Sequence, residues 1–376
     1  MTLRPATGEI AASLRQSHGY KTYLYSVDPP GSPLVSILSI SPTKNVTMLM
    51  FSHLFMLTLA SVAFSRPHTH SKRTSRTSAP PGCLTVGGNG TYATIGDAIT
   101  ALGSGSSSSS ACIYIEAGTY EEQLTFKYNG NLTIYGETTN TATYEENTVT
   151  ITHTISSPES GSLISSATVN AQMDDFAMYN VNVVNGFGKG AQAVALAATG
   201  DRQGYYGCQF IGYQDTLYAR DGIQYYSHCY VEGATDYIFG AASTWLSTCA
   251  IASNGAGYIT AMSRETASDP SWYCFDNCTI YEKPGLATAL TGKVYLGRPW
   301  RVLARVIYQN SVLSDIVHPA GWTTMAEGAT PLYYEIGNSG AGADASQRVW
   351  ESGIEEPVSR DTVLGVGWEE WVDGDY

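Results

Sequence analysis

The sequence predicts an all-β protein: a right-handed parallel β-helix, which is a solenoid of stacked coils, with a short capping helix at its N-terminal end. Two observations lead to this prediction. Short strand-like segments recur at intervals of 20 to 33 residues, and the composition combines 38 Gly with 26 Tyr but only 9 Phe. Irregular repeats of this length, with Gly, Asn and Thr between short strands, are typical of stacked coils. Many Gly and Tyr residues also suit turns and strands better than helices.

The recurring segments share a pattern of a polar or small residue, a small anchor residue, and an apolar residue two places on. The anchors are Val181, Cys208, Cys229, Cys249, Cys278 and Ser311. In a β-helix, equivalent positions of neighbouring coils lie one strand spacing, about 4.8 Å, apart. A β-sandwich is the alternative fold. Its turns recur at much shorter intervals, with hairpin dipeptides such as Asn-Gly, and these dipeptides are scarce in this chain.

Cysteine usage fits the same architecture. All seven cysteines lie beyond residue 82, as expected of an oxidising compartment. The four cysteine anchors would form a column through four coils, where they either form disulfides or pack as buried thiols. The segment 94–102, TIGDAITAL, predicts the capping helix, and a Cys83 to Cys112 disulfide would hold it in place. Cys274 and Cys278 have no nearby His or second Cys pair, so we expect neither a metal nor a cofactor.

The N-terminal part of the chain, 1–81, is expected to lie outside the folded domain, which covers 82–376. Residues 48–64 form the one long apolar run and look like a secretory signal peptide. Residues 1–47 are then an upstream extension from a start codon assigned too early. A membrane anchor is the alternative, but the run falls just short of the roughly 18 residues that span a bilayer. Residues 65–81 are basic and rich in Ser, Thr and Pro, as in a linker or pro-segment.

The net charge and the glycosylation sequons indicate which partners and which compartment to expect. The formal net charge of −13 argues against a nucleic-acid partner, because binding to phosphates needs positive charge. Sequons at Asn89, Asn131 and Asn277 agree with secretion, although Asn277 adjoins the cysteine column and either carries sugar or lies in a buried ladder. We expect a secreted, extracellular monomer with no stable membrane association.

Two acids stand at the spacing of one coil. Asp215 and Asp236 are 21 residues apart, and each lies seven residues after an anchor cysteine. They should therefore be stacked neighbours on one face of the solenoid. Repulsion and partial burial push the pKa values of two such carboxyl groups apart, so that one is ionised and the other protonated near neutral pH. This division suits a nucleophile and a general acid.

Two glutamines repeat nearly the same spacing. The interval from Gln192 to Gln214 is almost that between the two acids, and Gln214 adjoins Asp215, so the two amides should meet beside the acids. A single Gln is usually a surface residue. A pair at coil spacing beside two acids instead suggests uncharged donors for an oxyanion.

Five motifs carry a resemblance to a known family. They are GTYEE at 118–122, QAVAL at 192–196, YQDTLY at 213–218, DYIFG at 236–240 and LGRPW at 296–300. In this combination the sequence resembles the pectin methylesterases over about residues 83–352, and it is most similar to their fungal type. No register links the acids of GTYEE to the aspartate pair, so we expect that motif to serve structure.

The resemblance implies a reaction and a role for each residue. The substrate would be methyl-esterified pectin of the plant cell wall, with Asp236 as nucleophile and Asp215 as acid and base. Gln192 and Gln214 would hold the oxyanion, and Arg298 would pair with Asp236. The resemblance also implies that Trp300, Phe239 and Tyr213 contact the sugar, although aromatic residues at such positions are as often packing residues.

Other functions fit the sequence less well. A pectin lyase would need a calcium site. An inverting glycosidase needs carboxyl groups about 6.5 to 9.5 Å apart, which is more than the distance between equivalent residues of neighbouring coils. Neither has a use for the paired glutamines. A non-catalytic wall-binding protein is a further possibility, and it would more readily have lost Asp236 or Arg298. An aspartic protease does not fit, since Asp215-Thr-Leu is not a D-T-G turn.

Overall fold

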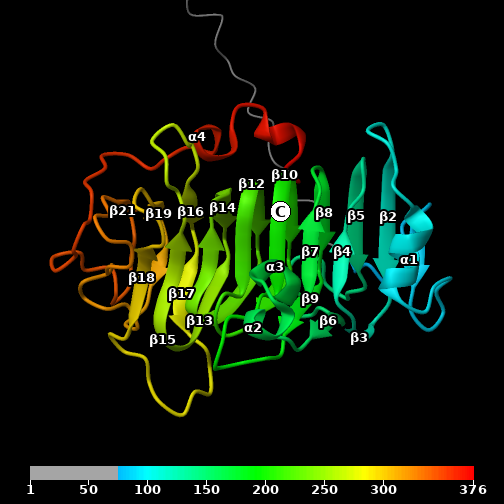
Figure 1. Cartoon of the computed structure of the whole chain (residues 1–376), viewed down its shortest axis with the longest axis horizontal. Helices are drawn as coiled ribbons and strands as arrows, with labels where there is room; N and C mark the ends of the chain where they lie inside the picture. Colours follow the sequence, from blue (N-terminus) through cyan, green and yellow to red (C-terminus); the bar gives the residue numbers. More distant parts are fainter. Residues whose placement is uncertain (1–74) are drawn as a thin grey trace, which may run out of the picture. The chain divides into compact units, whose positions relative to one another are not determined.

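In the computed structural model, which describes residues 75–376, parallel strands stack side by side and wind into a solenoid (Figure 1). This confirms the predicted parallel β-helix. The expected extension 1–47 and signal peptide 48–64 lie outside the described residues, as does the expected linker up to residue 74. Within residues 75–376, no helix combines the length and the apolar character that crossing a membrane requires.

The strands form three parallel faces, named here A, B and C. Face A contains β1 (Leu84–Val86), β2 (Ser110–Ile115), β5 (Asn131–Gly136), β8 (Phe176–Tyr179), β14 (Ser243–Ser247), β16 (Tyr273–Asp276), β19 (Arg305–Gln309) and β21 (Leu332–Ile336). Face B contains β3 (Gly118–Glu121), β6 (Val149–His153), β9 (Asn182–Asn185), β11 (Gln209–Ile211), β17 (Thr279–Glu282) and β20 (Val312–Leu313). Face C contains β4 (Leu124–Phe126), β7 (Val169–Gln172) and β18 (Val294–Pro299).

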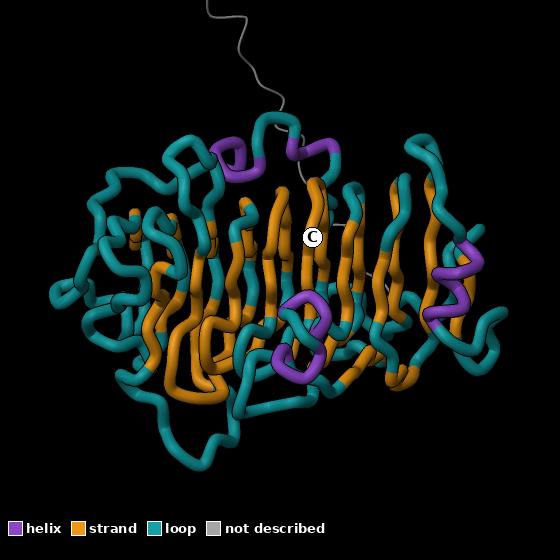
Figure 2. Tube along the Cα trace, viewed as in Figure 1, coloured by secondary structure: helices purple, strands orange, loops and turns teal. Residues whose placement is uncertain are grey.

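Four long strands bend around a corner and join two faces. The strands β10 (Leu196–Tyr206) and β12 (Leu217–Ser227) pass from face C to face A. The strands β13 (Tyr230–Gly240) and β15 (Ala250–Met262) pass from face B to face C. The chain therefore runs through A, B and C in each coil, and Figure 2 shows the resulting row of strands joined by loops.

The corner between faces A and B explains the repeated sequence pattern. The residue before each anchor lies in the left-handed region, with φ between 52° and 58°: Asn180, Gly207, His228, Thr248, Asn277 and Asn310. A left-handed residue turns the chain sharply, and Gly and Asn accept this conformation with the least strain. Asn277 is consequently exposed at the corner. The alternative in which it lies in a buried ladder is wrong.

The anchor residues form a column inside the solenoid. Cys208, Cys229, Cys249 and Cys278 are buried free thiols, and Cys274 is buried and free as well. The Cys208 N–H donates to the Cys229 sulfur at 3.4 Å, and the Cys278 N–H donates to the Ser311 hydroxyl at 3.0 Å. The column cysteines thus pack as small apolar residues and do not form disulfides with one another.

The helix α1 (Ile95–Leu102) covers the N-terminal end of the stack, as the sequence predicts. The Thr94 hydroxyl accepts the Asp97 N–H at 3.1 Å, and the Glu122 carboxylate accepts the N–H groups of Ile95 and Gly96, each at 2.9 Å. A carboxylate at this position satisfies free N–H groups of the first turn and complements the helix dipole. Glu122 of the GTYEE motif thus serves structure.

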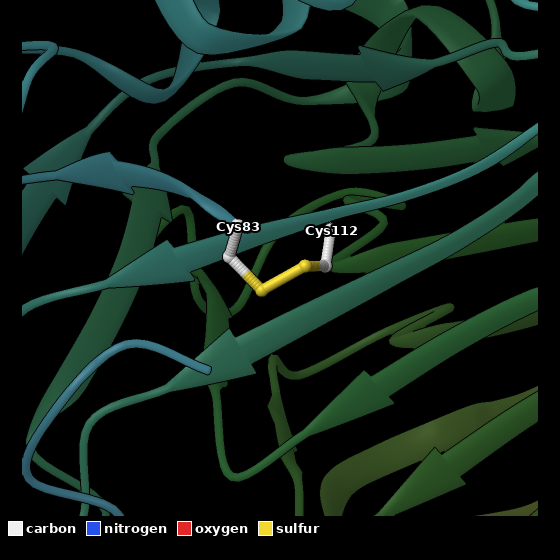
Figure 3. The surroundings of a disulfide bond; sticks show 2 residues. All are labelled: Cys83 and Cys112. Atoms are coloured by element: carbon white, nitrogen blue, oxygen red, sulfur yellow. A yellow bond between two sulfur atoms is a disulfide. The ribbon is translucent and has the colours of Figure 1, made fainter. Parts of the chain in front are cut away.

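The predicted Cys83 to Cys112 disulfide is present (Figure 3). It joins the residue that precedes β1 to the neighbouring strand β2, which pairs with β1 in parallel register. The bond therefore closes the first coil beside α1.

The C-terminal segment lies against face A. It contains α4 (Arg360–Leu364) and the 3-10 helix η1 (Trp368–Glu370), drawn in red above β10 to β14 in Figure 1. The backbone N–H of Asp373 donates to the Tyr206 hydroxyl at 2.9 Å, and the Ser227 hydroxyl donates to the Tyr376 carbonyl at 2.7 Å. The acidic, aromatic end therefore packs on the β-helix. The helices α2 (Ser157–Ser160) and α3 (Leu163–Ser166) lie between face B and face C in the chain.

The cysteine arrangement makes a prediction about thiol reactivity. We expect Ellman's reagent to find almost no reactive thiol in the native protein and five after denaturation without reductant, because the five free cysteines are buried. Reduction before the assay should raise the count by the two cysteines of the disulfide. Fewer than five thiols in the denatured, unreduced protein would show that the column contains disulfides.

Candidate active site

Asp215 and Asp236 lie in adjacent coils at the start of face C, as their spacing in the sequence predicts. Asp215 directly precedes the Thr216 that leads into β12, and Asp236 lies within β13. Leu217 pairs with Ile238, two residues beyond each acid, so the two aspartates share one register. The Asp215 N–H also donates to the Thr235 carbonyl at 3.1 Å.

Both aspartates have left-handed backbones, with φ of 64° at Asp215 and 50° at Asp236. Apart from Gly, only a few residue types accept this region readily, and Asp is one of them. The left-handed residue interrupts strand alternation, because Tyr237 and Ile238 both face the core while Asp236 points to the opposite side. Backbone strain of this kind is often concentrated at functional sites.

Arg298 forms a two-pronged ion pair with Asp236. Its Nε donates to Oδ1 at 2.9 Å and its Nη2 donates to Oδ2 at 2.6 Å, across 62 residues of sequence. The residue comes from β18 and is half-buried, whereas Asp236 is 6% exposed. Two parallel bonds to a planar guanidinium hold the carboxylate in a fixed orientation, which a Lys cannot do.

Asp215 lies in a different electrostatic environment from Asp236. Burial, together with repulsion from Asp236, raises the pKa of Asp215 from 3.8 to about 8, while a hydrogen bond from the Gln192 side chain and the charge of Arg298 act in the other direction. Near neutral pH the Asp215 carboxyl group is therefore protonated beside its arginine-paired neighbour.

The predicted glutamines and Tyr213 border this pair. Gln192 is exposed and its side chain binds Asp215. Gln214 is half-buried, accepts the Ala193 N–H on its backbone carbonyl at 3.0 Å and pairs with Thr235. Because Leu196 pairs with Leu217, the coil register places Gln192 level with Tyr213, one residue short of Gln214.

The predicted aromatic contacts form a cluster beside the acids. Phe239 stacks on Tyr218 with ring centroids 4.4 Å apart and contacts Trp300 at 5.9 Å. Trp300 is half-buried, but Phe239 is only 2% exposed and packs with Val194 and Ala261. Trp300 thus has surface to offer a ligand, while the visible contacts of Phe239 are packing contacts.

One neighbour of the acids was not found by sequence reasoning. The guanidinium carbon of Arg298 lies 3.8 Å from the centre of the Tyr258 ring. Tyr258 lies about one coil length after Asp236 in the sequence, so the repeat spacing contained a signal for it. The exact interval could not be read from the sequence, because Thr235 pairs with Tyr258 but Ile238 pairs with Thr260, which is a break in register.

Both acids are largely covered, with Asp215 4% exposed and Asp236 6% exposed. Two surface hollows of about 730 Å³ and 540 Å³ are lined by other residues, among them Arg202 and Arg220 in the first and Glu116 and Glu137 in the second. Among residues 75–376, no group of three or more His, Cys, Asp and Glu side chains is arranged to hold a metal ion.

The fold is a parallel β-helix, and comparison with known proteins gives its class, that of the carboxylic ester hydrolases. Residues 83–375 match the family model described as Pectinesterase. The chain is 71% identical over 329 residues to Pectinesterase A of Emericella nidulans, an alignment that covers 88% of this chain and all of that protein. The chain belongs to the pectinesterase family.

Solved structures agree with this assignment. The crystal structure of the pectin methylesterase from Aspergillus niger superposes with a TM-score of 0.79 at 66% identity, covering 80% of this chain and 100% of that one. Pectin methylesterase from carrot gives a TM-score of 0.71 at 27% identity, with 78% of this chain and 97% of that chain covered.

The raised pKa of Asp215 makes a prediction about stability. Its carboxyl group stays neutral to about pH 8 when folded but ionises from about pH 4 when unfolded, so this contribution to stability is complete below about pH 4 and is lost as the pH rises through 8. Asp215→Asn should therefore raise the melting temperature at pH 8 by about 5 °C and change it little at pH 4.

Thermal unfolding followed by circular dichroism at pH 4, 6 and 8 checks this expectation. Asp221→Asn is the matched control, because Asp221 is an exposed aspartate on β12, the strand that follows Asp215. A stabilisation of Asp215→Asn that is equal at all three pH values would contradict it.

Proposed function

We propose that this protein removes methyl groups from methyl-esterified homogalacturonan, with water as co-substrate and methanol and pectate as products. The observation that carries the proposal is the asymmetric carboxyl pair: Asp236 is bound at both oxygens by Arg298, and Asp215 has its pKa raised to about 8. A carboxylate nucleophile and a protonated acid side by side are what transfer of an acyl group from a methyl ester requires. The pectin methylesterases among the relatives support the choice of substrate.

In the first half of the reaction, a carboxylate oxygen of Asp236 attacks the ester carbonyl carbon of a galacturonate unit. The negative charge that forms on the carbonyl oxygen is stabilised by the side-chain N–H groups of Gln192 and Gln214. When the tetrahedral intermediate collapses, the bond to the methoxy oxygen breaks. Asp215 gives its proton to that oxygen, so methanol leaves and an acyl-enzyme on Asp236 remains.

In the second half, the carboxylate of Asp215 takes a proton from water while the water oxygen attacks the acyl carbon. The bond to Asp236 then breaks, releasing the galacturonate carboxyl group and restoring both aspartates. Arg298 keeps the Asp236 carboxylate oriented for attack and stabilises it as it departs. Trp300 and Tyr213 pack against the sugar, and Phe239 supports Trp300 by packing against its ring.

The rival reactions fit this geometry less well. Acids one strand spacing, about 4.8 Å, apart leave no room for the water that an inverting glycosidase places between its carboxyl groups. A lyase that uses calcium would bring several acids together, whereas Arg298 already occupies both oxygens of Asp236. We further propose that the protein is secreted and acts on pectin of the plant cell wall as a monomer. The Cys83–Cys112 disulfide and the exposed sequons at Asn89, Asn131 and Asn277 support secretion.

Product analysis tests the reaction. Incubation with highly methylated pectin should release methanol without unsaturated products or new reducing ends. Asp236→Asn should lower kcat by about a thousandfold or more, because an amide is a poor nucleophile. The control Asp221→Asn should keep wild-type activity. Rapid depolymerisation, or absorbance from unsaturated products, would show that the protein is a glycosidase or a lyase instead.

The dependence of the rate on pH tests the role of Asp215. The proton that it gives to methanol is present below its pKa of about 8 and absent above it. We therefore expect kcat/KM for methanol release to fall on the alkaline side with a midpoint near pH 8. Initial rates in buffers of constant ionic strength measure the midpoint. A rate that stays level to about pH 10 would exclude Asp215 as the acid.

A further inference from the structure

Arg298 is held from two sides. Toward the acids, its Nε and Nη2 bind both oxygens of Asp236. Against one face of the guanidinium, the centre of the Tyr258 ring lies 3.8 Å from the guanidinium carbon. A guanidinium attracts the electron-rich face of an aromatic ring, and the attraction grows when water is excluded, as it is at this half-buried position.

Tyr258 is itself the first ring of a stack that continues through two more coils. Its centroid lies 5.6 Å from that of Tyr295, with the planes 25° apart, and Tyr295 stacks on His318 at 4.3 Å and 19°. All three side chains are half-buried. The stack therefore runs along the solenoid with ring faces turned toward one another, not toward solvent.

The stack follows from strand register. Gln214 pairs with Thr235, Thr235 with Tyr258, and Tyr258 with Tyr295. The bridge between Val294 and Val317 places His318 next in the column. Each coil thus adds one ring to the column that begins beside the two acids.

The far end of the stack is fixed by hydrogen bonds. The His318 Nδ1 accepts the Ala320 N–H at 3.1 Å, and the His318 backbone N–H donates to the Val294 carbonyl at 2.8 Å. A ring anchored at this end limits the sliding of Tyr295 and, through it, of Tyr258.

We propose that Tyr258, supported by Tyr295 and His318, is a positioning residue that sets the plane of the Arg298 guanidinium and thereby the orientation of Asp236. The inference rests on the proposed function, in which Asp236 is the nucleophile. A long arginine side chain has several rotatable bonds, and two hydrogen bonds to a carboxylate that can itself rotate do not define one plane. A flat ring against the other side of the guanidinium removes that freedom.

Replacement of Tyr258 tests the proposal. Tyr258→Leu should lower kcat for methanol release roughly tenfold and change KM less than about twofold, because a misplaced nucleophile affects the transition state more than binding. Tyr258→Phe keeps the ring and should retain wild-type kcat. Tyr258→Met fills the space without a ring and should behave like Leu, which keeps the test valid if the Leu variant does not fold.

Two controls separate positioning from general support of the fold. Tyr334→Leu removes a half-buried ring on face A whose centroid lies 5.7 Å from that of Trp272, and it should leave kcat unchanged. In an Arg298→Ala background, Tyr258→Leu should lower kcat by no more than about twofold further, because the ring acts through the guanidinium. Melting temperatures identify any variant that is merely unfolded.

The outcomes are distinguishable. Wild-type kcat in Tyr258→Leu, an equal loss in the Phe variant, or a full tenfold further loss without Arg298 would each overturn the positioning role while leaving the esterase intact. Failure of the wild-type protein to release methanol would instead refute the proposed function.

Discussion

The backbone hydrogen bonds between successive coils set the register on which the rest of the molecule depends. In a solenoid each coil contacts only its neighbours, so residues meet because their positions in the repeat agree. Left-handed residues at the corner between faces A and B, such as Asn180 and Asn310, restart the strand at the same point in each coil. The same register produces the buried thiol column, the aspartate pair and the aromatic stack.

The register alone does not make the two acids different. Their neighbours do, because Asp236 has a guanidinium at both oxygens, whereas Asp215 is buried with an amide donor from Gln192 as its hydrogen-bond partner. Burial without a countercharge favours the neutral carboxyl group, and a fork of charged donors favours the ionised one. Two aspartates on one face thus have different electrostatic surroundings.

Much of this was predictable from sequence, and the failures have physical reasons. Repeat spacing predicted the fold and the meeting of Asp215 with Asp236, since backbone periodicity is what a solenoid preserves. It predicted Gln192 level with Gln214, whereas the structure places Gln192 level with Tyr213, because the step between these two coils is 21 residues. It did not find Tyr258, because the break in register between Thr235 and Ile238 changes the next step. Repeat spacing also does not show how far a side chain extends. The contact of Arg298 with Asp236 was therefore indicated by the family resemblance and not by the spacing. Whether the column cysteines bond or only pack depends on sulfur geometry that spacing does not contain.

The C-terminal segment has a consequence for how the solenoid folds and comes apart. A stack held only by nearest neighbours can fray from either end, coil by coil. Here the hydroxyl of Tyr376, the final residue, donates to the Thr141 carbonyl, and Asp373 binds both Tyr179 and Tyr206. These contacts join early coils to the C-terminal segment, far from them in the sequence. The coils that it contacts therefore lose stability together when the segment detaches.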